Sequence, residues 1–271
     1  MLMAALLHAG WHSLVKAGAD QTITLAGMGI VAGVPALAAL AFVPQPPAAL
    51  WPVLAASVGL HVGYKLCLSS AYANGELGEA FPLARGMVPL FATTIAFATL
   101  GQVPKIGQSL GIGLVSAGLL MVMLERQRGP NWRLWSAAAG AGLAVACYSV
   151  LDAYGVRRYG GWLGFTAWLI VLDNLVFLAL CRARRGPALW RDLFATRGRI
   201  LASGLLGLVS FCVFLWALSR GPVGAVSALR ETSMLFAILL GVLLHREKLS
   251  AARLGAVIMM LLGVVAIAAW R

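Results

Sequence analysis

Two ionisable side chains of opposite charge, Arg230 and Glu231, lie inside an apolar run that extends from about Val223 to Leu244. A run of about 20 apolar residues is long enough to cross a bilayer. A charge in hydrocarbon costs several kcal/mol, so such side chains face a polar cavity or each other, and by default they mark a functional site. An ion pair that only locks two helices together is the alternative, and it stays open.

A second arginine, Arg85, lies in another apolar run in the first half of the chain. When Arg85 is aligned with Arg230, Phe91 falls opposite Phe236, which indicates an internal duplication. Guanidinium groups stay charged, and they fork onto carboxylate or phosphate groups better than lysine does. We therefore expect the two arginines to converge at an anion site, with Glu231 neutralising one and leaving the other for the substrate.

Further polar side chains recur at helical spacing inside apolar runs. His8, His12 and Lys16 share one face of a predicted helix, and His61 and Lys65 share a face of another. Two histidines four residues apart could bind a metal, but no acidic or cysteine partner is nearby in sequence, so hydrogen-bonded cavity histidines are the favoured interpretation. The predicted substrate-binding residues are Arg85, Arg230, Glu231, Trp11, His12, Tyr64, Lys65, Tyr72, Tyr148, Asp152 and Trp216.

Three acidic residues lie inside apolar runs: Asp152, Asp173 and Glu231. Burial favours the protonated form of a carboxyl group, whereas a nearby arginine favours the charged form. A site that couples transport to protons needs those two effects near balance. Glu231, beside Arg230 and expected across from Arg85, is the first candidate for such a site, and a fixed ion pair is the equal alternative.

The composition is that of an integral membrane protein, because 61% of the 271 residues are hydrophobic and only 11% are charged, about half the charge of a typical soluble domain. The formal charge of +12 resides mostly in short connectors between apolar runs, where it orients helices, so no nucleic-acid partner is expected. The four cysteines have no metal-ligand spacing, no P-loop is present, and no cofactor or metal is expected.

Apolar runs separated by polar connectors predict ten helices, the first of which is a retained helix and not a signal peptide. Their approximate ranges are 2–17, 22–43, 52–73, 79–100, 106–124, 134–154, 161–181, 199–219, 223–244 and 251–270. Two tandem homologous halves with an odd number of spans must have opposite orientations in the membrane. The sequence therefore predicts an all-α integral membrane protein with ten transmembrane helices as two inverted five-helix repeats, residues 1–125 and 134–271.

Four short segments are the most distinctive in the chain: His8-Ala-Gly-Trp11 with Lys16, Pro82-Leu-Ala-Arg-Gly-Met-Val-Pro89, Leu229-Arg-Glu and His245-Arg-Glu-Lys-Leu-Ser250. Their order and spacing resemble the EamA-type branch of the drug/metabolite transporter superfamily over essentially the whole chain. The resemblance implies ten helices in two inverted bundles, a cavity lined by helices 1, 3, 4, 6, 8 and 9, and packing through helices 5 and 10. Two positions depart from the family pattern: His12 replaces a common Asn, and the connector 100–104 lacks the Glu that the second half keeps as Glu247.

The resemblance and the buried charges favour a secondary transporter, an exporter of a small polar or amphipathic metabolite, amino-acid-like or an organic anion, that works by alternating access. An intramembrane enzyme acting on lipid or prenyl substrates is the alternative, but it would need paired carboxylates for Mg²⁺, such as a DxxxD pair, and none is present. The expected partners are a small-molecule substrate and the lipid bilayer, while proton coupling and a homodimer stay open. The expected location is a bacterial-type inner membrane.

Basic residues in the connectors indicate how the spans are oriented. The connectors after predicted helices 1, 5, 7 and 9, counted with the helix ends beside them, carry thirteen Lys and Arg residues. The opposite connectors carry four, Lys105, Arg157, Arg158 and Arg220, and one more, Arg271, lies at the C-terminus. The charge bias therefore predicts that the odd connectors are cytoplasmic and both termini are outside. The resemblance implies the reverse, with both termini inside.

Overall fold

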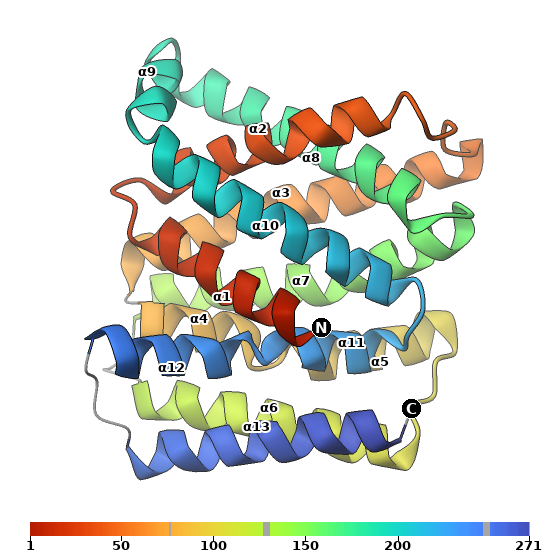
Figure 1. Ribbon diagram of the computed structural model, residues 1–271, viewed down its shortest axis with the longest axis vertical. Helices are drawn as coiled ribbons and strands as arrows, with labels where there is room; N and C mark the ends of the chain where they lie inside the picture. The colour runs from red at the N-terminus through yellow and green to blue at the C-terminus, as the bar shows by residue number, and fades with distance from the viewer. Residues whose placement is uncertain (76, 127–130, 246–249, 271) are drawn as a thin grey trace.

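The structure, a computed structural model, is a bundle of helices that lie side by side across the long axis of the molecule (Figure 1). It describes residues 1–75, 77–126, 131–245 and 250–270. Glu247 and the centre of the linker between the predicted halves lie outside these residues. The described ranges contain helices and no β-strand, which agrees with the predicted all-α class.

The helices follow the predicted segments closely, and two short elements, η1 and α9, appear in connectors where none was predicted. In chain order the elements are α1 (Leu2–Lys16), α2 (Gln21–Ala39), η1 (Ala48–Leu50), α3 (Trp51–Asn74), α4 (Leu77–Arg85), α5 (Val88–Leu100), α6 (Ile106–Arg126), α7 (Trp132–Arg158), α8 (Trp162–Arg185), α9 (Ala188–Ala195), α10 (Arg197–Leu218), α11 (Val223–Glu231), α12 (Ser233–His245) and α13 (Ala251–Ala269).

Eight helical segments of the described residues are long and apolar enough to cross a membrane, by length and composition. The predicted span 2–17 is not among them, because α1 has 15 residues and a bilayer core of about 30 Å takes roughly 20. The predicted span 223–244, which the structure divides into α11 and α12, is also not among them. The protein is therefore an all-helical membrane protein with eight candidate spans, and the count of ten stays a prediction.

The predicted helix 79–100 is broken in the structure, which corrects the expectation of one continuous helix. α4 ends at Arg85 and α5 begins at Val88. Pro89 explains the break, because it has no N–H to donate to the Arg85 carbonyl and its ring conflicts with that carbonyl. The break leaves Arg85 at the carboxyl end of a short helix.

The predicted helix 223–244 is broken as well. α11 and α12 meet at Thr232, whose hydroxyl donates to the Leu229 carbonyl at 2.6 Å. This side-chain bond competes with the backbone hydrogen bonds of a continuous helix. Like the first break, it lies beside a buried arginine, here Arg230.

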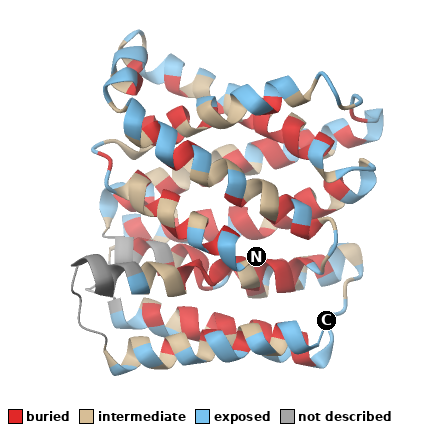
Figure 2. Cartoon of the chain, in the orientation of Figure 1, coloured by how far each residue is buried: buried red, intermediate tan, exposed pale blue. Residues whose placement is uncertain are grey.

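The centre of the bundle consists of two helix pairs, α3 packed on α7 and α1 packed on α10. α2 and α8 pack together on one side of these four, and α6 and α13 pack together at the opposite edge (Figure 1). Buried residues are concentrated on the faces that these helices turn toward one another (Figure 2). The arrangement encloses polar residues within the first group, whereas α6 and α13 form a separate apolar cluster with parts of α11 and α12.

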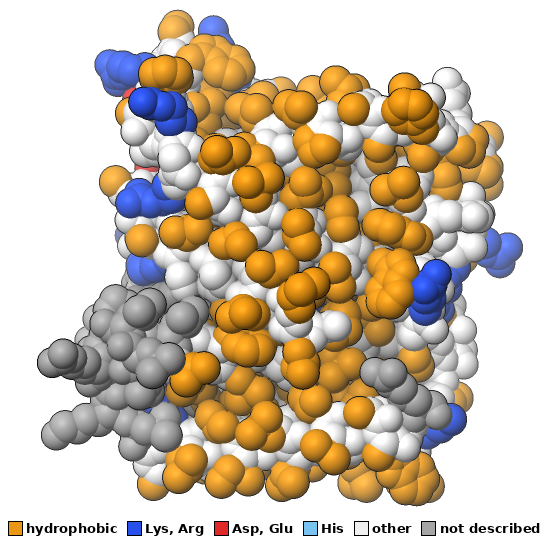
Figure 3. Space-filling model, in the orientation of Figure 1, with side chains coloured by type: hydrophobic (Ala, Val, Ile, Leu, Met, Phe, Trp, Pro, Cys, Tyr) orange, Lys and Arg blue, Asp and Glu red, His pale blue; other side chains and the backbone are white. Residues whose placement is uncertain are grey.

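The outer surface is strongly apolar. Large side chains such as Val34, Leu124 and Val265 are exposed. Hydrophobic side chains cover much of the face shown in Figure 3, and Lys and Arg side chains gather at its left and right edges. An apolar band between two basic rims is what a protein surrounded by lipid tails requires.

α6 and α13, the fifth and tenth helices of the prediction, approach each other closely at two glycines. A Cβ atom added at Gly111 would lie 2.6 Å from the Gly263 carbonyl oxygen, and one added at Gly263 would lie 2.6 Å from the Gly111 carbonyl oxygen. Small residues allow helix backbones to meet in this way. The contact fits the packing role that the resemblance implies for these helices.

We predict that Gly111→Leu destabilises the protein by about 1–3 kcal/mol, because the added side chain has to push α13 away. Gly113→Leu is the matched control, since no atom lies within 4 Å of a Cβ added at that position of the same helix. Thermal unfolding in detergent micelles measures both variants. Equal unfolding midpoints would contradict the close approach of α6 and α13.

A second prediction concerns orientation. If the charge bias governs, a reporter that is active only in the cytoplasm is inactive when fused after Arg271. It is active when inserted between α8 and α10 at 186–196, a segment with arginines on both sides. Reporter activity in cells measures both fusions. The reverse pattern would contradict the charge count and support the orientation that the resemblance implies.

Candidate functional site

A cavity of about 120 Å³ lies within the bundle, between α1, α2, α3, α7, α8, α10 and α11. Apolar side chains form most of its wall, and a few polar side chains from different helices reach it, as in many small-molecule sites. Its polar and aromatic lining residues include His8, Trp11, His61, Tyr64, Lys65, Tyr148, Asp173, Asn174, Phe211 and Arg230. The lining differs from the one that the resemblance implies, because α2 and α8 contribute to it and α4 does not.

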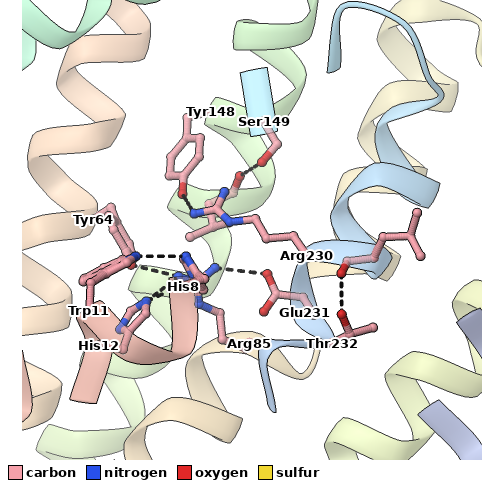
Figure 4. Close-up of polar contacts among 12 residues, drawn as sticks. His8, Trp11, His12, Tyr64, Arg85, Tyr148, Ser149, Arg230, Glu231 and Thr232 are labelled. Carbon is pink, nitrogen blue, oxygen red and sulfur yellow. Dashed lines mark hydrogen bonds and ion pairs between the residues drawn. The ribbon is translucent and has the colours of Figure 1, made fainter. Parts of the chain in front are cut away.

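Arg85 is completely buried and forms an ion pair with Glu231 (Figure 4). Nη1 of Arg85 donates to the Glu231 carboxylate at 3.0 Å. Nη2 donates to the Tyr64 hydroxyl at 2.9 Å and to His12 Nε2 at 3.2 Å. The pair joins α4 to α11, so Glu231 lies across from Arg85 as predicted and neutralises that arginine.

Two histidines of α1, His8 and His12, lie beside Arg85 (Figure 4). The Trp11 indole N–H donates to His8 Nδ1 at 3.1 Å, and His8 Nε2 lies 3.1 Å from His12 Nε2. His12 Nδ1 lies 2.6 Å from the Tyr72 hydroxyl. Because His8 Nδ1 and His12 Nε2 both accept, the hydrogen bonds assign both rings as neutral imidazoles, with His8 donating to His12. These bonds support the interpretation as hydrogen-bonded histidines.

Arg230 has a different environment from Arg85. Its side chain lines the cavity, and Nη2 donates to the Tyr148 hydroxyl at 3.3 Å. The guanidinium carbon lies 4.1 Å from the centre of the Phe214 ring. Within the described ranges no carboxylate forms an ion pair with Arg230, and its buried Nη1 has no hydrogen-bond partner.

Lys65 lines the cavity and is neutralised by an acid of α8. Its Nζ donates to Asp173 at 2.7 Å and to the Asn174 side-chain oxygen at 2.8 Å. The second carboxylate oxygen of Asp173, Oδ1, is buried and has no partner among the described residues. Asp173 is also one of the residues that line the cavity.

Asp152 is fully buried on α7, behind the cavity wall. Its carboxylate accepts from the Ser57 hydroxyl and lies 3.0 Å from His61 Nε2. The His61 ring stacks on Tyr148 with the ring centres 3.9 Å apart. The Tyr148 hydroxyl also accepts from Arg230. The Tyr148 ring therefore lies between that arginine and the His61–Asp152 pair.

Five of the predicted substrate-binding residues line the cavity: Trp11, Tyr64, Lys65, Tyr148 and Arg230. Five others form a second layer connected to it by hydrogen bonds: His12, Tyr72, Arg85, Asp152 and Glu231.

The structure does not bring Trp216 to the cavity, which corrects the expectation that it forms an aromatic wall. Its side chain is 39% exposed and lies against Arg220, whose guanidinium carbon is 4.7 Å from the ring centre. Phe214, two residues earlier on α10, is buried against Arg230 instead. Residues two apart in a helix point in nearly opposite directions, so both could not face inward.

The sequence prediction of the site omitted His8, His61, Asp173 and Asn174, which line the cavity. A signal was available for the first two, because each lies four residues from a predicted site residue on the same helix face. Asp173 and Asn174 lie mid-way along an apolar run, which also marks a functional position. Their connection to Lys65 depends on how α3 and α8 pack, and no sequence spacing encodes that.

An all-helical bundle with an apolar surface and a cavity that polar side chains reach is an architecture that membrane transport proteins use. The model of the EamA-like transporter family matches residues 134–269, half of the chain, and the protein belongs to this family of the drug/metabolite transporter superfamily. The chain is also similar to a solved structure titled "Crystal structure of protein", with a TM-score of 0.75 and 20% identity over 97% of this chain and 93% of that chain. At that identity the likeness shows the fold alone. No curated protein matches the chain.

The buried ion pair generates a third prediction. Removing one partner of such a pair leaves an uncompensated charge and costs about 3–5 kcal/mol. Arg85→Gln and Glu231→Gln should therefore each lower the thermal unfolding midpoint in detergent more than the double variant does. Arg191→Gln, at an exposed ion pair with Asp192, should change little. Strictly additive losses in the double variant would contradict the pairing.

Proposed function

We propose that the protein is a secondary transporter that exports a small organic anion, or an amino-acid-like metabolite with an anionic group, across a bacterial-type inner membrane by alternating access. Its membership in the EamA-like transporter family supports the transport class. The charges around the cavity support the anionic substrate. The volume of about 120 Å³ supports a small one.

The observation that carries the proposal is the charge balance at the cavity. Arg85 with Glu231, and Lys65 with Asp173, form two neutral pairs. Arg230 is the third cation. Its side chain lines the cavity, and among the described residues it has no carboxylate partner and its buried Nη1 has no hydrogen-bond partner. A buried guanidinium costs free energy until an anion joins it. A carboxylate or phosphate of the substrate fits this role, because it accepts two parallel bonds from the guanidinium.

The remaining walls of the cavity favour a substrate with an apolar body and a second polar end. Trp11, Tyr64 and Tyr148 supply aromatic surface. The unpartnered Oδ1 of Asp173 offers an acceptor for a hydroxyl or ammonium group of the substrate. An anion with such a donor would satisfy both orphan groups at once.

The architecture supports alternating access by two inverted five-helix repeats. The breaks beside Arg85 and Arg230 lie at equivalent places in the two halves. In the proposed repeat, α1 corresponds to α7 and α3 corresponds to α10. The contacts agree with this correspondence, because α1 packs on α10 and α3 packs on α7. In inverted-repeat transporters the site lies where the halves meet, and one half rocks against the other.

The fourth prediction is that Arg230 binds the anionic group directly. Metabolites in the external medium of cells with and without the protein identify the exported compound, and the same assay then compares Arg230 variants. Arg230→Gln should weaken apparent affinity by roughly 30-fold or more, since losing a buried charged contact costs about 2–5 kcal/mol. Arg230→Lys should be impaired less severely, because the ammonium keeps the charge and loses the fork.

Arg220→Gln is the matched control, because this arginine lies outside the cavity against Trp216. It should export at the wild-type rate. Full export by a normally folded Arg230→Gln variant, with unchanged apparent affinity, would show that the anion binds elsewhere.

A further inference from the structure

We propose that His61 and Asp152 together form a proton-binding site, and that a proton bound there accompanies the anion bound by Arg230. The coupling to an anion rests on the proposed function, whereas the proton site rests on the geometry of α3 and α7 alone. The proton site and its coupling to the anion are both inferred from the partners of the three buried carboxylates.

The three intramembrane carboxylates differ in their partners. Glu231 lies 3.0 Å from an arginine, and Asp173 lies 2.7 Å from a lysine. Protonating either acid would leave its cation buried without a counter-charge, which is strongly unfavourable. Asp152 is paired with His61 instead. Histidine is the side chain whose own charge changes between about pH 5 and 8, so this pair can take up a proton and remain paired.

The geometry of the pair assigns the atom that receives the proton. His61 Nε2 lies 3.0 Å from Asp152 Oδ2, and the other carboxylate oxygen accepts from the Ser57 hydroxyl. With its Nε2 proton directed at Asp152, a neutral His61 ring has its lone pair on Nδ1. No hydrogen bond joins Nδ1 to another side chain in the described part of the protein, and the ring lines the cavity. A proton from the cavity can therefore bind Nδ1 without breaking an existing bond.

The two histidines of α1 are poorly suited to the same task. His8 Nδ1 accepts the Trp11 indole proton, and His12 Nε2 accepts from Arg85. Adding a proton at either acceptor would direct two N–H groups at each other. For His12 the second N–H belongs to a guanidinium, so the new charge would also be repelled.

Tyr148 connects the proton site to Arg230. Its ring stacks on His61 at 3.9 Å, and its hydroxyl accepts from Arg230 at 3.3 Å. With His61 neutral, the negative charge of Asp152 balances the positive charge of Arg230 across this ring. An anion that binds Arg230 alone would leave the site negative, whereas an anion and a proton together leave it neutral. The two ligands should therefore favour each other's binding, and by linkage each does so by the same factor.

Other charged or titratable groups face His61 from the surrounding helices, and they enter the same balance. They are Asp152 and Tyr148 of α7, Tyr64 and Lys65 of α3, Asp173 of α8, His8 of α1 and Arg230 of α11. The charges of Lys65 and Asp173 cancel, because the two side chains form an ion pair. The groups whose charge remains to be balanced are Asp152 and Arg230.

Co-binding fixes the relation between the two fluxes. A proton and an anion that bind together cross the membrane in the same direction. Each anionic charge then leaves with a proton, so export requires an outward substrate gradient that exceeds any inward gradient of protons.

The test uses the full-length protein in lipid nanodiscs with isotope-labelled histidine, and the probe is the proton itself. NMR spectra recorded from pH 5 to 8 follow each imidazole, and the His61 signal is identified by its absence in His61→Gln. The wild-type His61 should change from neutral to charged within this range. In Asp152→Asn, the ratio of charged to neutral His61 at a given pH should fall at least about tenfold, because an opposite charge is lost.

Arg230→Gln imitates neutralisation of the guanidinium by an anion, so it should increase the charged fraction of His61 at a given pH. Arg220→Gln, which removes an arginine outside the cavity, should leave that fraction unchanged. If His8 or His12 titrates and His61 does not, the proton site is overturned. If Arg230→Gln and Arg220→Gln behave alike, the coupling is overturned. Neither result depends on whether Arg230 binds the exported compound, which the export assay decides separately.

Discussion

The Arg85–Glu231 ion pair is the interaction on which the rest of the site depends. Both side chains lie at the carboxyl ends of short helices, α4 and α11. A cation is favourable at a helix carboxyl terminus and an anion is not, so Arg85 offsets an unfavourable position of Glu231 as well as its charge. The pair also connects the two helix breaks, because it joins the last residue of α4 to the last residue of α11.

The pair also gives different surroundings to the two arginines that align in the predicted duplication. In the alignment of the halves, Glu231 follows Arg230 where Gly86 follows Arg85. A Cβ added at Gly86 would lie 3.2 Å from the Pro82 carbonyl oxygen and 3.3 Å from the Leu120 side chain, so a glutamate there would be crowded. The second half therefore supplies the one carboxylate. It neutralises the arginine of the first half and leaves its own neighbour, Arg230, at the cavity.

Apolar runs were sufficient to predict most of the helices and the burial of Arg85, Arg230 and Glu231, because a charged side chain inside such a run is stable only in a polar cavity or beside an opposite charge. A proline such as Pro89 marks a helix break in the sequence, whereas Thr232 does not. A threonine hydroxyl competes with the backbone hydrogen bonds of a helix only in some contexts. Trp216 was misplaced because an aromatic residue in an apolar run fits a cavity and a lipid surface equally well. The partner of Asp152 depends on how α3 packs against α7, and sequence spacing within one helix carries no information about that.

Charge balance can also explain why a transporter of this design would include a histidine at all. In the proposed scheme the empty site is neutral overall, since Asp152 offsets Arg230 across the rings of His61 and Tyr148. With a proton and an anion bound, the proposed site is neutral too. With only one of the two, it would carry a net charge in a low-dielectric interior, where an unbalanced charge is costly. The proposal therefore favours the conformational change for the empty and the fully loaded protein, and a fixed cation in place of His61 would remove that discrimination.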